Sequence, residues 1–416
     1  MVREAVSTLF KMSLSWKERV HSWFVVLILR FFQFIFRLLP SGSKSVKHLP
    51  PIRNPLLLLS AVQLAEKIRR REVTSVEVVQ AYIDRIQEVN PLLNALVKDR
   101  FSLALLEAAL ADKIIEEDNR GESFLREQYP LLGVPTSIKE SFALQGMPNS
   151  VGLKFRANLL SNLDAPPVAY LKRAGAIPLG VTNTSELCMW MESNNHLYGI
   201  TNNPYDLGRT CGGSSGGEGS IIGGGASVFG IGSDIGGSIR MPCFFNGIFG
   251  HKPSKGVVSN NGQYPICSGL QDDYVGSGPM CRYAEDLLPL LKIMAGPAAN
   301  KLSLSKDVDL KKLRFFTVVD DGGSLVTSPV AKQLVHAQKM VAKRLEADLG
   351  VQVKEVRFPQ LKYAFHIWDT FLALPDKDGK PPSRMAELMG DGSAVWPVWE
   401  LIKHIFGRSD HTVAAI

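Results

Sequence analysis

Cysteine is scarce in this sequence. The 416 residues contain five, and none form a C-x-x-C pair. So sparse and odd a set does not make a disulfide framework, and we expect free thiols in a reducing compartment. The excess of positive over negative charge is also small. The chain has 47 Lys and Arg against 40 Asp and Glu, and no basic block is longer than the arginines at 69–71. The net charge of +7 is therefore spread over the chain, and no nucleic-acid partner is expected.

Several familiar catalytic and cofactor motifs are missing. The eight histidines show no HExxH or other metal-ligand spacing. Lys252 precedes a proline where a Walker loop needs Ser or Thr, and Ile235 replaces the third glycine of a dinucleotide fingerprint. The sequence thus predicts neither a metal nor another cofactor. Gly212-x-Ser214-x-Gly216 matches a nucleophile elbow, but a polar, turn-like stretch precedes it instead of a buried strand, which argues against an α/β-hydrolase.

Composition and patterning predict an ordinary α/β protein. Apolar residues make up 45% and charged residues 21% of a chain long enough to bury a substantial core. Thr74-x-x-Glu77 is a capping box that opens a helix, which we expect Pro91 to end. Residues 168–183 show a helix, a glycine stop and a buried strand, and helix and strand segments alternate again up to about residue 365.

A long apolar run stands near the N-terminus. Of the 17 residues at 23–39 (WFVVLILRFFQFIFRLL), 13 are Phe, Val, Leu or Ile. They contribute roughly −6 kcal/mol to insertion, against about 3 kcal/mol for Arg30. We predict a membrane-anchoring helix between a polar and basic tail at 1–22 and a Pro/Ser/basic linker at 40–55. The run is short for a span, and Arg30 and Arg37 share one helical face, so a span and an interfacial helix both remain open, as does the orientation.

Glycine is concentrated between residues 208 and 250, where 15 of the chain's 36 glycines lie. Such density indicates backbone that needs positive φ or close approach to a ligand. The segment contains GGSSGG at 212–217, DIGGSIR at 234–240 and GIFGHKPS at 247–254, and GVPTSIKES precedes it at 133–141. Together these motifs resemble the amidase signature family, and the apolar N-terminus resembles a membrane-bound branch of it.

The resemblance covers residues 56–416 and implies an amidase-signature α/β/α sandwich around a mixed β-sheet. Chains of the family continue past the point that matches Ile416. We therefore expect an amidase domain over 56–416 that is incomplete at its C-terminus, behind the N-terminal membrane helix.

The resemblance also implies a Ser–Ser–Lys triad, with Ser238 as nucleophile, Ser214 as bridging serine and Lys139 as base. A serine hydroxyl becomes a good nucleophile only when a neighbour takes its proton, and a lysine can do so only when burial keeps it neutral. The apolar neighbours Val134 and Ile138 are compatible with such burial. Taken singly, Lys139 would be a solvated strand end and the serines turn residues, but their joint occurrence with the glycines favours the triad.

Other site residues follow from the same resemblance. The family's bridging serine lies on a cis peptide bond. Apart from the resemblance, Asp234 and Arg240 flank the nucleophile loop, and we expect them to hold it as a pair. Cys188 falls where relatives contact the acyl group. The expected oxyanion donors are the backbone N–H groups of Ile235, Gly236 and Gly237.

The function expected on this basis is membrane-anchored serine amidohydrolysis. The enzyme would cleave fatty-acid amides (primary amides and N-acylethanolamines) to fatty acid and amine through an acyl-serine, on an intracellular membrane or lipid droplet. Its partners would be the lipid amide and the membrane, with a homodimer left open. Two alternatives remain: a glutamine-hydrolysing protein that aminates misacylated tRNA with partner chains, which the apolar run argues against, and a truncated, inactive membrane-bound protein.

Overall fold

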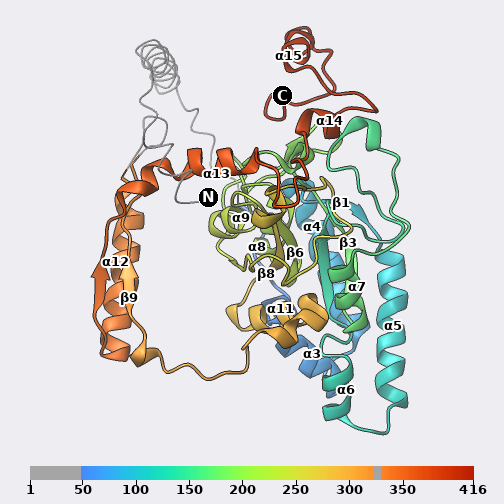
Figure 1. The fold of residues 1–416 in the computed structure, drawn as a ribbon. Helices are drawn as coiled ribbons and strands as arrows, with labels where there is room; N and C mark the ends of the chain where they lie inside the picture. The colour runs from blue at the N-terminus through green and yellow to red at the C-terminus, as the bar shows by residue number, and fades with distance from the viewer. Residues whose placement is uncertain (1–47, 323–328) are drawn as a thin grey trace. The chain divides into compact units, whose positions relative to one another are not determined.

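A computed structural model describes residues 48–322 and 329–416 (Figure 1). The helix that the sequence predicts at 23–39 lies outside these residues. In the part of the chain that the structure describes, every helix falls short of the length or the apolar character needed to cross a membrane.

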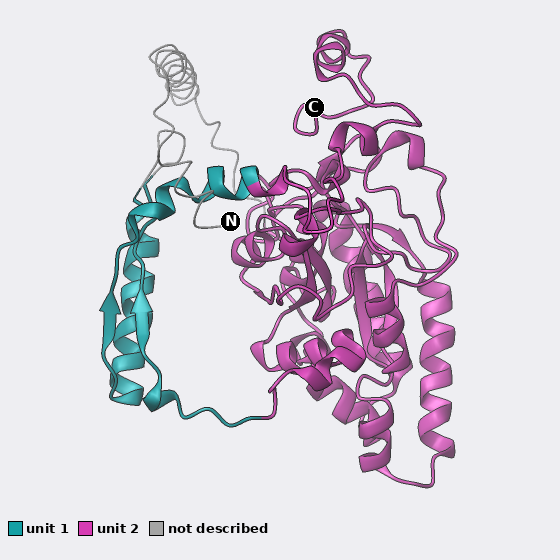
Figure 2. Ribbon diagram, viewed as in Figure 1, with its two compact units in different colours: residues 1–44, 306–370 teal, residues 45–305, 371–416 magenta. Residues whose placement is uncertain are grey.

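The chain divides into two compact units (Figure 2). Of the described residues, the larger unit comprises 48–305 and 371–416, and the smaller comprises 306–322 and 329–370. All predicted site residues belong to the larger unit, so its fold is what positions the site.

A six-stranded mixed sheet forms the centre of the larger unit, in the order β1-β3-β2-β6-β8-β7. The pair β2–β3 and the pair β2–β6 are parallel, whereas the three remaining pairs are antiparallel. The strands are β1 (Leu96–Asp99), β2 (Pro135–Lys139), β3 (Ile177–Thr182), β6 (Phe229–Asp234), β7 (Phe249–Gly250) and β8 (Gly276–Cys281). Because β2, β3, β6 and β8 are buried along their whole length, helices must cover both faces.

The connections confirm the predicted layers. Helix α7 (Pro166–Arg173) joins β2 to β3, and α8 (Gly216–Gly223) lies between β3 and β6. Since β3 and β6 flank β2 on opposite sides and parallel crossovers are right-handed, α7 and α8 cover opposite faces of the sheet. Helix α11 (Leu287–Ala295) packs on α7, and α4 (Ser75–Leu93) packs on α8. The arrangement is an α/β/α sandwich (Figure 1).

Helix α4 begins as its sequence predicts and ends later. The Thr74 hydroxyl accepts the Glu77 N–H at 3.1 Å, and the Glu77 carboxylate accepts the Thr74 N–H at 2.8 Å. The predicted stop at Pro91 is wrong, because Pro91 lies inside the helix, which ends at Leu93. A proline in the last turn removes a single hydrogen bond, while the burial of Leu93 and a left-handed Asn94 (φ 51°) that caps the end carry the helix past it.

The remaining helices and strands complete both units. In the larger unit they are α3 (Ala61–Arg69), α5 (Phe101–Glu117), α6 (Glu122–Gln128), β4 (Asn194–Asn195), β5 (Gly199–Ile200), α9 (Arg240–Asn246), α10 (Gln271–Tyr274), α14 (Met385–Met389) and α15 (Pro397–Ile405). In the smaller unit, β9 (Phe315–Thr317) pairs in parallel with β10 (Val353–Glu355) beside α12 (Lys332–Leu349). Helix α13 (Ala364–Leu372) runs across the boundary between the units.

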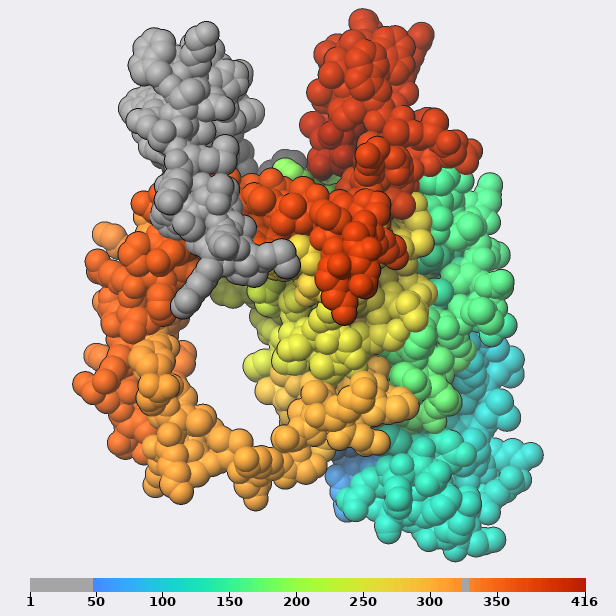
Figure 3. Space-filling model, in the orientation of Figure 1, coloured from blue at the N-terminus to red at the C-terminus, as the bar shows by residue number. Residues whose placement is uncertain are grey.

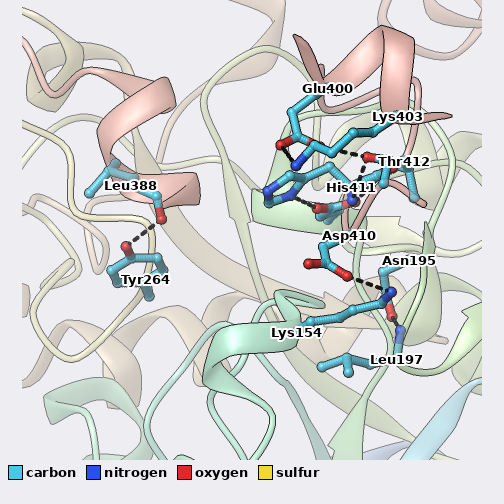
Figure 4. A network of polar contacts seen from close by, with 12 residues as sticks. Lys154, Asn195, Leu197, Tyr264, Leu388, Glu400, Lys403, Asp410, His411 and Thr412 are labelled. Atoms are coloured by element: carbon cyan, nitrogen blue, oxygen red, sulfur yellow. Dashed lines mark hydrogen bonds and ion pairs between the residues drawn. The ribbon is translucent and has the colours of Figure 1, made fainter. Parts of the chain in front are cut away.

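Residues 371–416, drawn in red, are the C-terminal part of the larger unit (Figure 3). Lys154 Nζ lies 2.9 Å from Asp410, and the Tyr264 hydroxyl donates to the Leu388 carbonyl at 2.9 Å (Figure 4). The carboxylate of Glu186 lies 2.7 Å from His411 Nδ1 and accepts the backbone N–H of residue 412 at 2.7 Å. These contacts fix the loop in which Glu186 stands, two residues before a predicted site cysteine.

Candidate active site

Lys139 stands at the end of β2 with its side chain fully buried. Its Nζ donates to Ser214 Oγ at 2.7 Å and to Ser233 Oγ at 3.0 Å. Burial lowers the pKa of Lys139, against the smaller attraction of Cys188 and Asp234, which act in the opposite direction. An amine with a lowered pKa can lose its proton and take one back from the hydroxyl beside it, so the pair suits general-base chemistry.

Ser214 lies in the loop before α8, and the peptide bond that joins it to Gly213 is cis. Its carbonyl accepts the hydroxyls of Thr184 at 2.9 Å and Ser193 at 3.2 Å. A Cβ at position 213 would lie 2.5 Å from the Trp190 carbonyl oxygen, so a side chain does not fit there. The glycines of the GGSSGG motif thus allow this loop to pack closely against its neighbours.

Ser238 follows β6 and precedes α9, and 8% of it is exposed. Its carbonyl accepts the N–H of Ser215 at 3.2 Å, which joins the two serine loops one residue away from Ser214. Among the described contacts, no hydrogen bond joins the hydroxyls of Ser214 and Ser238. The structure therefore brings Lys139 and Ser214 into contact and places the Ser238 loop against the same segment.

The loop between β6 and Ser238 is held by Asp234, whose carboxylate is buried. Oδ1 accepts the N–H of Gly237 at 2.8 Å, and Oδ2 accepts the N–H groups of Ile239 at 3.1 Å and Arg240 at 3.2 Å. The Arg240 guanidinium adds Nε at 3.0 Å and Nη2 at 2.9 Å, which confirms the predicted pair. Burial alone would raise the pKa of Asp234, but Arg240 and the backbone donors hold it below its ordinary value.

The three expected oxyanion donors lie along this loop. Ile235 is partly buried and Gly236 is exposed, so this part of the loop faces the outside. Gly237, at φ +124°, uses its N–H for Asp234. Glycine suits that position because residues with a side chain rarely adopt such a φ.

Comparison with known proteins identifies the family. The amidase family model matches residues 77–378. Fatty-acid amide hydrolase 2-B of Danio rerio is 78% identical over 405 residues, which are 97% of this chain and 77% of that protein. The chain belongs to the amidase family. Fatty-acid amide hydrolase 2 of Homo sapiens is 52% identical over 377 residues, 90% of this chain and 71% of that protein.

A solved structure agrees with this assignment. The chain titled "Fatty acid amide hydrolase" superposes with a TM-score of 0.65 at 25% identity. The alignment covers 84% of this chain and 63% of that one, so the present chain spans less than two thirds of it. The family predicted from the sequence motifs is confirmed. Members of this family are hydrolases that act on amide C–N bonds.

Cys188 of this amidase lies beside the Lys139–Ser214 contact. It has a left-handed backbone (φ 57°), and its Sγ lies 3.3 Å from the Thr184 hydroxyl that also holds the Ser214 carbonyl. Cys188 is partly buried, and the two residues after it are exposed. The cysteine therefore stands between the buried base and the protein surface.

Sequence reasoning missed three residues of this amidase site. Ser233 ends up beside Lys139 because β2 and β6 are parallel neighbours, so the carboxyl ends of both strands meet. The position of Ser233 before the DIGGSIR loop could have revealed it. Thr184 and Ser193 gave no signal, since their contacts with Ser214 depend on loop packing. Over residues 48–322 and 329–416, no cluster of His, Cys, Asp or Glu side chains is suited to a metal ion.

Proposed function

We propose that this amidase hydrolyses fatty-acid amides through an acyl-serine intermediate on Ser238. The support is sequence identity: two relatives named fatty-acid amide hydrolase 2 are 78% and 70% identical to the chain. A glutamyl-tRNA(Gln) amidotransferase chain from Carboxydothermus hydrogenoformans is 35% identical, so the tRNA-dependent alternative has the weaker support.

The observation that carries the mechanism is the buried Lys139 amine at 2.7 Å from the Ser214 hydroxyl. In the proposed first step, Ser238 Oγ attacks the amide carbonyl carbon while its proton passes to Ser214 Oγ. Ser214 gives its own proton to neutral Lys139, which becomes an ammonium ion. The carbonyl π electrons move onto the oxygen, and we assign backbone N–H groups of the loop at residues 235–237 to stabilise that charge.

The second half returns the proton. The C–N bond breaks as Ser214 protonates the departing amine and recovers a proton from Lys139, which leaves an ester on Ser238. Water then attacks the ester carbonyl carbon, and its proton follows the same route through Ser214 to Lys139. Collapse of the second intermediate breaks the C–O bond, and the proton returns to Ser238 as the fatty acid leaves.

A fluorophosphonate probe and three variants test this proposal. The probe should label wild type and fail to label Ser238→Ala. Lys139→Met should lower kcat on a fatty-acid amide by roughly 10²- to 10⁴-fold, the range of general-base catalysis. Ser220→Ala is the matched control, because that buried serine on α8 bonds to the Asn202 carbonyl at 2.7 Å, away from the triad. Amidase activity in Ser238→Ala, or glutamine as the preferred substrate, would reject the proposal.

We also propose that residues 23–39 anchor the enzyme to a membrane where lipid amides dissolve. The support is the apolar composition of that run, in which 13 of 17 residues are Phe, Val, Leu or Ile. Alkaline carbonate extraction of cell membranes should leave the full chain in the pellet and release a chain that lacks residues 1–39. If the shortened chain stays in the pellet, the anchor lies elsewhere.

A further inference from the structure

A buried carboxyl group lies beneath the candidate base without a role in the mechanism above. Glu218, in the first turn of α8, is fully buried. Its Oε2 lies 2.7 Å from Ser137 Oγ on β2, and its Oε1 lies 2.8 Å from Thr182 Oγ1 on β3. Ser137 and Lys139 are two residues apart on β2, and side chains two residues apart in a strand point to the same face.

The contact of Ser137 continues into a chain. Ser137 Oγ lies 3.0 Å from Ser227 Oγ, and the Ser227 hydroxyl donates to the Phe229 carbonyl at 2.8 Å. With the two contacts of Glu218, these groups make four contacts, and Thr182 Oγ1 also lies 3.5 Å from the Ile138 carbonyl, farther than from Glu218. All three hydroxyl groups are buried.

Counting hydrogens settles which group donates. The Phe229 carbonyl can only accept, so Ser227 donates to it, and Ser137 must then donate to Ser227. Thr182 donates its hydrogen to Oε1. The contact between Ser137 Oγ and Glu218 Oε2 still needs a hydrogen, and the carboxyl group is the remaining source. Three hydroxyl hydrogens for four contacts thus favour a protonated Glu218 over a carboxylate that accepts from Ser137. In agreement, burial raises the pKa of Glu218 to about 7.

The backbone makes room for this carboxyl group. A Cβ at position 230 on β6 would overlap Glu218 Oε2, and glycine occupies that position. Glycine weakens a strand interior, so its presence in a central strand indicates close approach by another group. Here that group is the Glu218 carboxyl. The elements tied together are α8, which follows Ser214, β2, which carries Lys139, and β6, which leads to Ser238.

We propose that Glu218 is a positioning residue of the candidate active site, a neutral carboxylic acid that fixes α8, β2 and β6 through Ser137 and Ser227 without adding an anion beside Lys139. The inference rests on the proposed function in that it assigns Lys139 as the base. Lys139 on β2 and Cys243 on α9 interact electrostatically with Glu218. An ionised Glu218 would favour the ammonium form of Lys139, which is the form that cannot act as base.

Two substitutions separate the effect of charge from that of hydrogen bonding. Glu218→Leu removes the donor and should lower kcat at least about tenfold while KM changes little, because the strand spacing shifts but the substrate surface does not. Glu218→Gln keeps a donor toward Ser137 and an acceptor for Thr182, and it should rescue kcat to within about threefold of wild type. In the plot of kcat/KM against pH, the acid limb of Glu218→Gln should have the same midpoint as that of wild type. A downward shift of about one pH unit would mean that an ionised Glu218 had served as counter-ion of Lys139, and would overturn the proposal.

Infrared difference spectroscopy tests the protonation state without relying on activity. The spectrum of wild type minus Glu218→Gln at about pH 6 should contain the carbonyl stretch of a protonated carboxylic acid. A carboxylate band in its place refutes the inference, whatever the activity of either protein. If instead the carboxylic acid band is present and Ser238→Ala remains active, the proposed function fails while the assignment of Glu218 as a neutral acid stands. Gly230→Ala, which displaces the carboxyl group, should reproduce the loss seen in Glu218→Leu.

Discussion

Replacing Asp234 by asparagine tests how the nucleophile loop is held. The carboxylate accepts three backbone N–H groups, from Gly237, Ile239 and Arg240. Asparagine keeps one acceptor oxygen and presents an NH₂ group to the remaining donors, so at least one backbone hydrogen bond is lost and the other two no longer end on a charge. The lost bond costs about 1.5 kcal/mol and the weakening of the other two about as much again, so we expect about 3 kcal/mol less stability. The Arg240 side chain is 59% exposed, so its ion pair adds little to that sum.

The assay combines unfolding with kinetics. Urea denaturation should show the loss of about 3 kcal/mol, and kcat should fall about a hundredfold with little change in KM, as when an oxyanion donor is misplaced. Arg240→Gln is the control, and it should cost less than about 1 kcal/mol. Because the folded-state pKa of Asp234 is lowered, its stabilisation is present above the unfolded pKa of about 3.9 and disappears as the pH falls further. An Asp234→Asn protein with wild-type kcat, or an Arg240→Gln protein equally damaged, would refute this account of the loop.

Three further predictions concern other parts of the molecule. Burial raises the pKa of Glu140 to about 7, so the native state favours the protonated acid. The free energy of unfolding should therefore be higher at about pH 4.5 and fall as the pH rises to about 7. The loss is roughly 3 kcal/mol at most, and Glu140→Gln should abolish it in urea titrations at the two pH values. Gly217→Ala should destabilise by about 3 kcal/mol in the same assay, since a Cβ there would lie 2.5 Å from the Asn183 backbone. Glu186→Gln weakens the contact with His411, and limited proteolysis should then cut the last forty or so residues faster than in wild type, with an equal rate refuting the role of this contact.

The sequence predicts those parts of the fold whose signals are local. The capping box at Thr74 and Glu77 appears where its pattern places it, and so do the helix and the buried strand predicted at 168–183. Pro91 shows the limit of such reasoning, because burial of Leu93 outweighs a helix-breaking residue. Tertiary packing decides the outcome there, and the local pattern carries no information about it.

In the candidate site, too, residues with a local sequence signal could be predicted and residues placed by tertiary packing could not. Lys139 and Ser214 could be predicted because their motifs are specific, and the structure places them in contact. The role of Glu218 could not be predicted, because it depends on which strands are neighbours and on where Gly230 leaves space. Neither the order of the strands in the sheet nor the room beside a glycine can be worked out from the sequence alone.

The central sheet has a consequence for biogenesis. All six of its strands, and the three candidate triad residues between them, lie within residues 96–281. Domains generally fold from the N-terminal side as the ribosome releases them. The scaffold of the site can thus assemble while later codons are still being read. The contact of His411 with Glu186 forms later, because His411 lies 130 residues after the last strand of the sheet.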